Sequence, residues 1–296
     1  AYVPSSCEVV QNEVGTAPIL WFEKDEKVLV SMPGVPFEMQ HMMKKVLIPK
    51  LVKKTHDNMH LQYRTFIVID IIESLLAMQL DDFEKELPEY MHLAYLPTPG
   101  LIRLRLTGAC KDESLLSANM DKFSAKLHEL VGDKIICDED MPLAQILGKK
   151  LLEKGMTVAS AESCTGGNIA HEITRIAGSS SYFKGSVVSY ANEVKINVLN
   201  VSSADIDVHG VVSEPVVQQM VSGVCKVMNT DCAISTSGIA GPGGAEPGKP
   251  VGTVWIAAKA ADNVVSQCFH FPGDRERVIN RATNEGIKML LKLLND

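Results

Sequence analysis

The second half of the chain alternates short apolar runs with amphipathic segments. Helical periodicity runs through residues 143–154 and stops at Gly155. Apolar runs typical of strands cover residues 156–161, 186–190, 232–237, 253–258 and 264–271, the last two forming a predicted hairpin. Helices are predicted at residues 167–176, 193–199, 216–228 and from a cap at Asp274 to about 293. This alternation predicts an α/β sandwich around a mixed sheet in residues 141–296.

A second pattern of strands and helices occupies residues 61–137. Strands are predicted at 64–71, 91–95 and 101–107, and helices at 73–86 and 111–131. Arg103 and Arg105 alternate with apolar residues, so both should lie on one face of the sheet. That face is either a solvated surface or an RNA-binding surface. The acidic residues 138–140 that follow are either a solvated linker or metal ligands.

Residues 1–60 carry weaker signals. We expect a strand at 27–31, a Pro/Gly loop at 32–36 and a helix at 37–54 that is interrupted at Pro49. Little other β-structure is expected. Met39, Met42 and Met43 share helical spacing and are predicted to lie in a core. The chain opens without methionine on AYVPSSCEVV, which is typical of the middle of a domain, so we expect a trimmed chain or a fragment.

Composition narrows the classes of function. The 296 residues carry a formal net charge of −7 and no dense Lys/Arg block, which argues against a nucleic-acid partner. No apolar run reaches the roughly 18 residues of a membrane helix. The seven cysteines are scattered, odd in number and free of any CxxC pair, which favours reduced thiols over disulfides or zinc. We therefore expect a cytoplasmic, multidomain protein with no membrane partner.

The candidate chemistry is concentrated where the strand at 156–161 ends. The sequence there is Glu-Ser-Cys-Thr at 162–165, followed by two glycines and an amphipathic segment. Hydroxyls, a thiol and backbone N–H groups at a strand-to-helix turn can form an oxyanion-binding site. Further along the chain come Tyr190 and Lys195. Ser163, Tyr190 and Lys195 together can form a hydrolase that needs neither histidine nor metal.

Other interpretations of the 162–165 cluster stay open on the residues alone. Ser163 or Thr165 could simply cap the helix that follows. Cys164 competes with Ser163 as nucleophile, because a thiol at a helix N-terminus has a lowered pKa. His171 or His209 could then approach as its base.

Two partial motifs are set aside. Residues 243–249 satisfy the start of a phosphate-binding loop, but Pro250 stands where that loop needs Ser or Thr. Ser181 and Lys184 have the S-x-x-K spacing of serine acylases, which requires a helical turn. Here the serine lies in a loop that runs into a strand, so we interpret the match as coincidence.

The segments AESCTGGNIAHEITRIAGSSSYFKGSVVSYANEVK, HGVVSEPVV, STSGIAGPGG, KPVGTVWIA and FPGDRERVINRAT strongly resemble the C-terminal domain of the CinA (competence/damage-inducible protein) family. The stand-alone bacterial versions of that domain are nicotinamide mononucleotide deamidases. The resemblance implies Ser163 as nucleophile, with Tyr190 and Lys195 as its activating partners. It also implies a hydrolase of pyridine-nucleotide salvage that acts on a small nucleotide, needs no cofactor and forms a homo-oligomer, a dimer.

In such a deamidase, neutral Lys195, its pKa lowered by burial, would take the proton from Ser163. N–H groups near 165–167 would hold the oxyanion, and Tyr190 would orient the lysine or relay a proton to ammonia. Arg275 and Arg281 are the candidates for binding the substrate's phosphate. The substrate-binding residues we expect are Glu162, Thr165, Gly166, Gly167, Thr236, Gly238, Gly241, Arg275 and Arg281.

The remaining segments resemble other parts of CinA. NEVGTAP and MPGVPFEM are similar to the tail of a molybdopterin-binding-like domain, linked in the family to metal-dependent ADP-ribose pyrophosphatase activity, and residues 61–137 resemble the KH-like connector. The front of the first domain is absent from the 296 residues, and Ile19 stands where the family usually has glycine. These departures argue against the pyrophosphatase, so a divalent metal is expected only if that activity is present. The alternatives to the deamidase are the pyrophosphatase and a non-enzymatic protein of competence or DNA damage.

Overall fold

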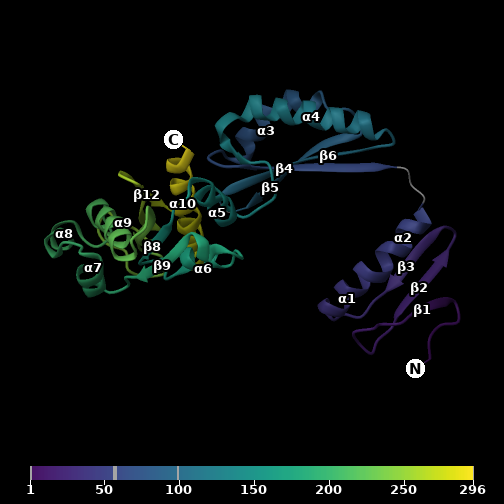
Figure 1. Ribbon diagram of the computed structural model, residues 1–296, viewed down its shortest axis with the longest axis horizontal. Coiled ribbons are helices and arrows are strands. Elements are labelled where there is room, and N and C mark those ends of the chain that lie inside the picture. Colours follow the sequence, from purple (N-terminus) through teal and green to yellow (C-terminus); the bar gives the residue numbers. More distant parts are fainter. Residues whose placement is uncertain (1, 56–58, 99, 296) are drawn as a thin grey trace. The chain divides into compact units, whose positions relative to one another are not determined.

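The computed structural model of the chain describes residues 2–55, 59–98 and 100–295 (Figure 1). It divides into two compact units, Ala1–His60 and Leu61–Asp296. Each unit is described by itself. No helix in the described ranges is both long enough and apolar enough to cross a membrane.

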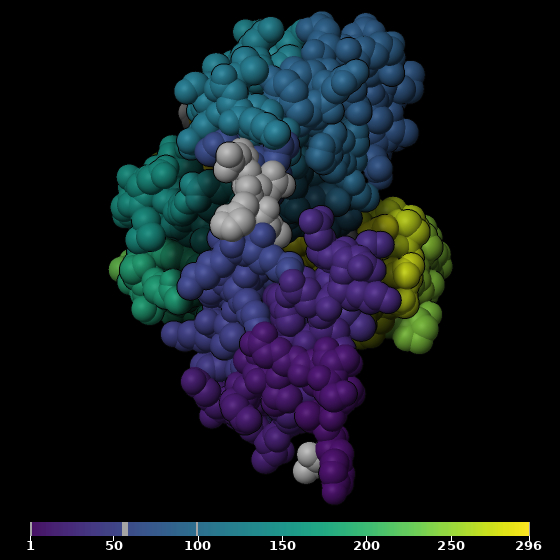
Figure 2. Space-filling view, turned by 90° about the vertical axis from the view of Figure 1, so that its right-hand side faces the viewer, coloured from purple at the N-terminus to yellow at the C-terminus, as the bar shows by residue number. Residues whose placement is uncertain are grey.

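The N-terminal unit is a three-stranded antiparallel sheet with one helical segment. Its strands are β1 (Cys7–Val10), β2 (Ile19–Lys24) and β3 (Lys27–Ser31), in that spatial order. The third strand has the predicted bounds, but the expectation of little other β-structure is wrong. Ile19, Trp21, Met42 and Leu47 form a small buried core. In Figure 2 this unit is the purple body, and its elements pack into one continuous mass.

The helical segment of this unit is continuous through Pro49, where an interruption was predicted. It consists of α1 (Pro36–Met42), a π-helical turn η1 (Met43–Leu47) and α2 (Ile48–Thr55). Proline lacks an N–H and clashes with the carbonyl four residues earlier. The wider π turn just before Pro49 gives that carbonyl room. Of the three methionines predicted to be in the core, Met42 and Met43 pack in it and Met39 is exposed.

The first part of the second unit is a four-stranded sheet, in the order β5-β6-β4-β7, with two long helices on one face (Figure 1). Its elements are β4 (His60–Val68), α3 (Glu73–Lys85), β5 (Met91–Thr98), β6 (Leu101–Cys110), α4 (Glu113–Val131), η2 (Gly132–Lys134) and β7 (Ile135–Cys137). Leu104 and Leu106 of β6 are fully buried in the core that these helices cover.

The other face of β6 carries Arg103 and Arg105, as the alternation predicts. Both guanidinium groups pair with the carboxylate of Asp140, at 2.8 and 3.1 Å. Asp138 contacts His128, and Glu139 contacts Lys149. Within the described ranges, no three His, Cys, Asp or Glu side chains are grouped so that they could hold a metal ion. The acidic segment therefore connects the two parts of the unit through ion pairs.

The C-terminal part contains the predicted mixed sheet, in the order β12-β11-β10-β8-β9. The strands are β8 (Val158–Glu162), β9 (Phe183–Val188), β10 (Cys232–Gly238), β11 (Thr253–Ala260) and β12 (Asn263–His270). β8 lies between β9 and β10 and runs parallel to both. β11 and β12 form the predicted antiparallel hairpin.

Helices cover both faces of this sheet. They are α5 (Leu143–Lys154), α6 (Asn168–Thr174), α7 (Asn192–Leu199), α8 (Ser203–His209), α9 (Glu214–Met228) and α10 (Arg275–Asn295), with a 3-10 turn η3 (Ser179–Ser181). Val158 of β8 faces a core shared with α5, α6 and α10, whereas Ala159 faces α7 and α9. The predicted α/β sandwich is thus confirmed.

The capping residues at three helix starts agree with the sequence to different degrees. Asp274 accepts a hydrogen bond from the N–H of Arg277 at 2.9 Å, as predicted. Ser213 stands at the predicted N-cap of α9, but its hydroxyl donates instead to the carbonyl of Gly210. The short helix α8, capped by Ser202, was not predicted.

Candidate active site

The candidate site lies where three parallel strands end together. The N–H of Ser163, just after β8, donates to the carbonyl of Thr236 in β10 at 3.0 Å. The N–H of Ser189, just after β9, donates to the carbonyl of Glu162 at 2.8 Å. Ligands of α/β sheets bind at the carboxyl ends of the strands, where loops leave the sheet on different sides. The sequence places its hydroxyl cluster at this edge.

Ser163 and Lys195 come together, as predicted. The Nζ of Lys195 lies 3.2 Å from the Oγ of Ser163 and donates to the carbonyl of Ser189 at 2.6 Å. Lys195 projects from α7 and is only 1% exposed. Burial disfavours the charged ammonium and lowers the pKa of Lys195, with a smaller opposing effect from Cys164. The pair therefore has the geometry of a nucleophile beside a base.

Cys164 has the opposite electrostatics to those expected of a nucleophile. Burial raises the pKa of the Cys164 thiol to about 12, so it stays protonated at neutral pH. The predicted lowering of this pKa is wrong. His171 and His209 are both exposed. Across the described ranges, no hydrogen bond joins either imidazole to Ser163 or Cys164.

Glu162 occupies the N-terminus of α6. Its side chain is fully buried, and its carboxylate lies within hydrogen-bond distance of three backbone N–H groups and three hydroxyls. These donors are Gly167, Ile169 and Ala170 through their N–H groups, and Ser160, Thr165 and Ser186 through their hydroxyls. A carboxylate at this position satisfies the first turn and interacts favourably with the helix dipole.

This network changes the interpretation of two predictions. Glu162 holds the turn beside Ser163 together, so its carboxylate is not available for substrate. The helix cap comes from Glu162, and neither Ser163 nor Thr165 provides it. Thr165 instead bonds Glu162 and the hydroxyl of Thr236, at 2.7 and 2.8 Å, and both threonines are buried.

The backbone donors near Ser163 also differ from the prediction. Gly166 donates to the carbonyl of Ser163 and Gly167 donates to Glu162, so neither N–H is free for an oxyanion. Both glycines have positive φ, 61° and 101°, which explains why this tight turn contains them. In the part of the chain that the structure describes, the N–H groups of Cys164 and Thr165 donate to no other residue, and the Cys164 N–H bonds only its own thiol.

Tyr190 lies outside the Ser163–Lys195 pair. Its side chain is 62% exposed, and its hydroxyl accepts a hydrogen bond from Arg275 at 3.0 Å. Arg275 also donates to the carbonyl of Gly241 at 2.8 Å. No hydrogen bond links Tyr190 to Lys195 among the described residues. The structure thus brings Tyr190, Arg275 and the glycine loop together at the surface.

The other predicted binding residues have local roles. A Cβ at Gly238 would lie 2.7 Å from the carbonyl oxygen of Thr253, so glycine there permits close strand packing. Arg281 donates to the carbonyl of Pro272 at 3.2 Å. The two rejected motifs remain rejected. Ser181 ends the 3-10 turn η3, where a loop was predicted, but Lys184 lies in β9, so no helical turn spans the two side chains. Lys249 donates to the carbonyl of His209 in a segment that leads into a strand.

Two family models match the chain. The model described as CinA C-terminal domain matches residues 140–294, and that described as damage-inducible protein CinA KH domain matches residues 63–136. A CinA-like protein of Flavobacterium psychrophilum is 44% identical over 99% of this chain and 70% of its own length. A CinA-like protein of Cytophaga hutchinsonii is 38% identical over 100% of the chain and 71% of its own length. The chain belongs to the CinA family.

Solved structures of competence/damage-inducible proteins resemble about half of the chain. The competence damage-inducible protein A of Klebsiella pneumoniae is 37% identical, with a TM-score of 0.51, over 52% of this chain and 95% of that one. The competence/damage inducible protein of Agrobacterium tumefaciens is 35% identical, with a TM-score of 0.50, over 52% and 94%. The motifs that suggested CinA therefore identified the family correctly.

The sequence did not point to Ser189, whose carbonyl accepts a hydrogen bond from the Nζ of Lys195. Ser189 is fully buried and follows β9 as Ser163 follows β8. The parallel strand ends were the available signal, since residues just beyond adjacent parallel strands lie side by side. The contribution comes from the backbone, however, and no side-chain pattern encodes it.

Proposed function

We propose that this CinA protein hydrolyses the carboxamide of nicotinamide mononucleotide to give nicotinate mononucleotide and ammonia. The observation that carries the proposal is the Nζ of a buried lysine 3.2 Å from the Oγ of Ser163. Because burial lowers the pKa of Lys195, a neutral amine is accessible as the base. Membership of the family supports hydrolase chemistry at this domain.

Acylation would begin when neutral Lys195 takes the proton of the Ser163 hydroxyl. The Ser163 oxygen attacks the amide carbon, and the carbonyl oxygen becomes the oxyanion of a tetrahedral intermediate. The N–H groups of Cys164 and Thr165 are the donors that remain for this oxyanion. Protonated Lys195 then gives its proton to the amide nitrogen as the carbon–nitrogen bond breaks, and ammonia leaves.

Deacylation would use the same two residues. Lys195, neutral again, takes a proton from water, and the resulting hydroxide attacks the acyl carbon. The bond to the Ser163 oxygen breaks, that oxygen recovers the proton from Lys195, and nicotinate mononucleotide leaves. The carbonyl of Ser189, 2.6 Å from Nζ, keeps the amine oriented in both steps.

The nucleotide would be bound by the surface group at the same edge of the sheet. Arg275 is fixed by Gly241 and Tyr190, so its guanidinium is positioned for a phosphate. The exposed ring of Tyr190 offers a face to the positively charged pyridinium ring. Arg281, whose guanidinium donates to the carbonyl of Pro272, stays our second candidate for the phosphate. Tyr190 thereby becomes a binding residue in our proposal, because it lies with Arg275 and has no hydrogen bond to Lys195.

The test is release of ammonia from nicotinamide mononucleotide in the presence of EDTA. We expect turnover by the intact chain and none by Ser163→Ala. Nicotinamide riboside, which lacks the phosphate, should be a poorer substrate with a higher KM, because Arg275 has no anion to bind. Absence of ammonia, or activity seen only as metal-dependent cleavage of ADP-ribose, would reject the proposal.

The cellular setting is proposed on the same basis. We place the protein in the cytoplasm, where pyridine nucleotides and reduced thiols occur together. All seven cysteines are free in the structure.

We also propose a homodimer, and light scattering of the purified chain gives the test: a monomeric mass would reject it.

A further inference from the structure

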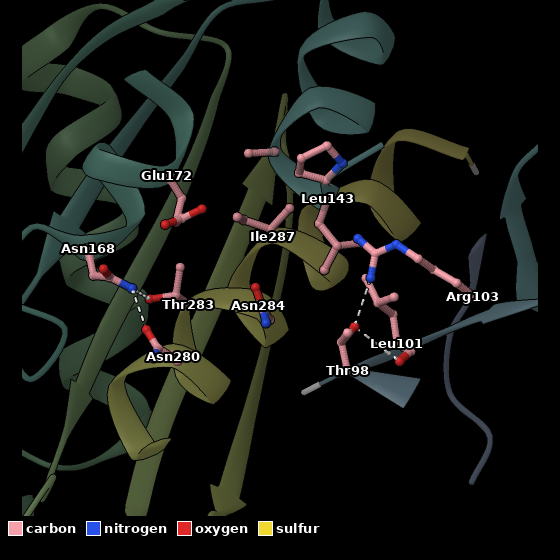
Figure 3. Close-up of a pocket in the computed structure, with 12 residues that line it drawn as sticks. Thr98, Leu101, Arg103, Leu143, Asn168, Glu172, Asn280, Thr283, Asn284 and Ile287 are labelled. Carbon is pink, nitrogen blue, oxygen red and sulfur yellow. Dashed lines mark hydrogen bonds between the residues drawn. The ribbon is translucent and has the colours of Figure 1, made fainter. Parts of the chain in front are cut away.

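A cavity of about 350 Å³ lies apart from Ser163 and Lys195 in the second unit (Figure 3). Its walls come from the β5–β6 hairpin and from helices α5, α6 and α10. The volume is at the lower end for small-molecule pockets, which suits a mononucleotide. None of the predicted site residues lines it, so its chemistry is independent of the proposed deamidase.

One end of the cavity presents paired amides. The Asn168 amide nitrogen donates to the amide oxygen of Asn280 at 3.3 Å and to the hydroxyl of Thr283 at 2.9 Å. These bonds orient the amide of Asn168, and the single 3.3 Å bond orients that of the exposed Asn280. The oxygen of Asn168 and the nitrogen of Asn280 have no partner among the described residues. Glu172 points into the same end in Figure 3, and Arg175 donates to both of its carboxylate oxygens, at 2.9 and 3.1 Å, which leaves further lone pairs on those oxygens. The end therefore offers two acceptors and one donor side by side.

The middle of the cavity is apolar and the far end is cationic. Leu143 and Ile287 lie between the amides and Arg103 in Figure 3. Arg103 is held by Asp140 at 2.8 Å and by the hydroxyl of Thr98 at 3.1 Å. A guanidinium fixed in this way loses little side-chain entropy when it binds an anion, and its second terminal nitrogen is still available.

We propose that this cavity binds an adenine mononucleotide. The exocyclic amine of adenine supplies two donors, for Asn168 and Glu172, and a neighbouring ring nitrogen accepts from Asn280. The ring lies against Leu143 and Ile287, and the phosphate reaches Arg103. The hydrogen-bond acceptors at one end and the guanidinium at the other match the amine and the phosphate of this ligand.

The matched ligand pair is AMP and IMP. Each is titrated calorimetrically into the full Ser163→Ala chain, with nicotinamide mononucleotide present to fill the proposed deamidase site without being turned over. IMP replaces the amine with an oxygen that would face Glu172, so we expect it to bind at least about tenfold more weakly. Binding of AMP needs no turnover, so failure here is distinguishable from failure of the deamidase.

Asn280→Asp is the decisive variant, because it keeps the oxygen that Asn168 bonds and replaces only the free donor. We expect it to weaken AMP by about tenfold or more. In Arg103→Gln the preference for AMP over adenosine should disappear. Asn263→Ala, an exposed asparagine on β12, is the control and should bind AMP like the parent. The proposal is overturned by absence of AMP binding at about 1 mM, by equal affinity for IMP, or by unchanged AMP affinity in Asn280→Asp.

Discussion

Ser163 and Cys164 are neighbours in the chain with opposite chemical character. Cys164 is buried and its raised pKa keeps the thiol protonated, whereas the hydroxyl of Ser163 lies beside the amine of Lys195. We expect Ser163→Ala to lower kcat by about three orders of magnitude or more, and Cys164→Ala to retain most activity. Ammonia release measures both. The assignment fails if Cys164→Ala is the inactive variant while Ser163→Ala still turns over.

The burial of Lys195 predicts a pH dependence. Its pKa is lowered in the folded protein, so the neutral base is formed as pH rises through that pKa, below the ordinary value of about 10.4. The rate should therefore rise with pH and level off once the amine is neutral. A profile of kcat against pH provides the measurement.

Two substitutions separate a base from a fixed charge at this position. Lys195→Arg keeps a cation that does not give up its proton, and Lys195→Met keeps the length without the amine. Both should be nearly inactive. An active Lys195→Arg enzyme would mean that the lysine acts only through its charge.

At the scale of elements, the start of α6 depends on one side chain from the preceding strand. Glu162→Gln would place an amide nitrogen against the N–H groups that the carboxylate now accepts. Because the turn between β8 and α6 carries Ser163, we expect kcat to fall by about tenfold or more, with a loss of about 1 to 3 kcal/mol in the free energy of unfolding.

Urea unfolding and kcat measured on the same samples test this prediction. Glu153→Gln, an exposed glutamate on α5, is the matched control and should change neither quantity. If Glu162→Gln kept full activity, the position of Ser163 would not depend on the carboxylate.

At the scale of the whole second unit, its two parts share both apolar and ionic contacts. Ile67, Ile69 and Leu101 belong to the same buried cluster as α5 and α10. Asp70 also pairs with Lys288 at 3.4 Å and with Lys292 at 2.5 Å, and the Lys288 side chain is only 5% exposed. The sheet of residues 61–137 is therefore attached to α10 through these contacts.

Asp70→Asn should lower the free energy of unfolding by about 1 kcal/mol at neutral pH, because the buried Lys288 loses one carboxylate partner and keeps only Glu285, at 2.6 Å. Burial alone would raise the pKa of Asp70, but Lys292 and Lys288 outweigh it and hold that pKa below its ordinary value. The stabilisation is thus full above the unfolded pKa of about 3.9 and is lost as pH falls through the lower folded pKa. Urea unfolding at neutral and acidic pH should show the difference between parent and variant shrinking on acidification; a difference that persists in acid would contradict this account.

The sequence by itself determined most of the elements and the family. Helix α5 and strand β3 have their predicted bounds, because apolar periodicity and a terminal glycine are local signals. The Ser163 motif and the β11–β12 hairpin were likewise readable in the chain. Local signals failed at Pro49, where they predicted an interruption of the helix. The π turn just before it gives room for the proline ring, so the helical segment continues.

The tertiary structure alone decided which of the candidate residues meet. Parallel pairing of β8 with β9 and β10 brings residues far apart in sequence to one edge, so Lys195 reaches Ser163. Burial then set the charge states, with Cys164 protonated and the pKa of Lys195 lowered. Tertiary contacts also determined that Glu162, and neither Ser163 nor Thr165, caps the N-terminus of α6. Proton affinity and hydrogen-bond partners depend on what surrounds a group, and the order of residues along the chain does not specify those surroundings.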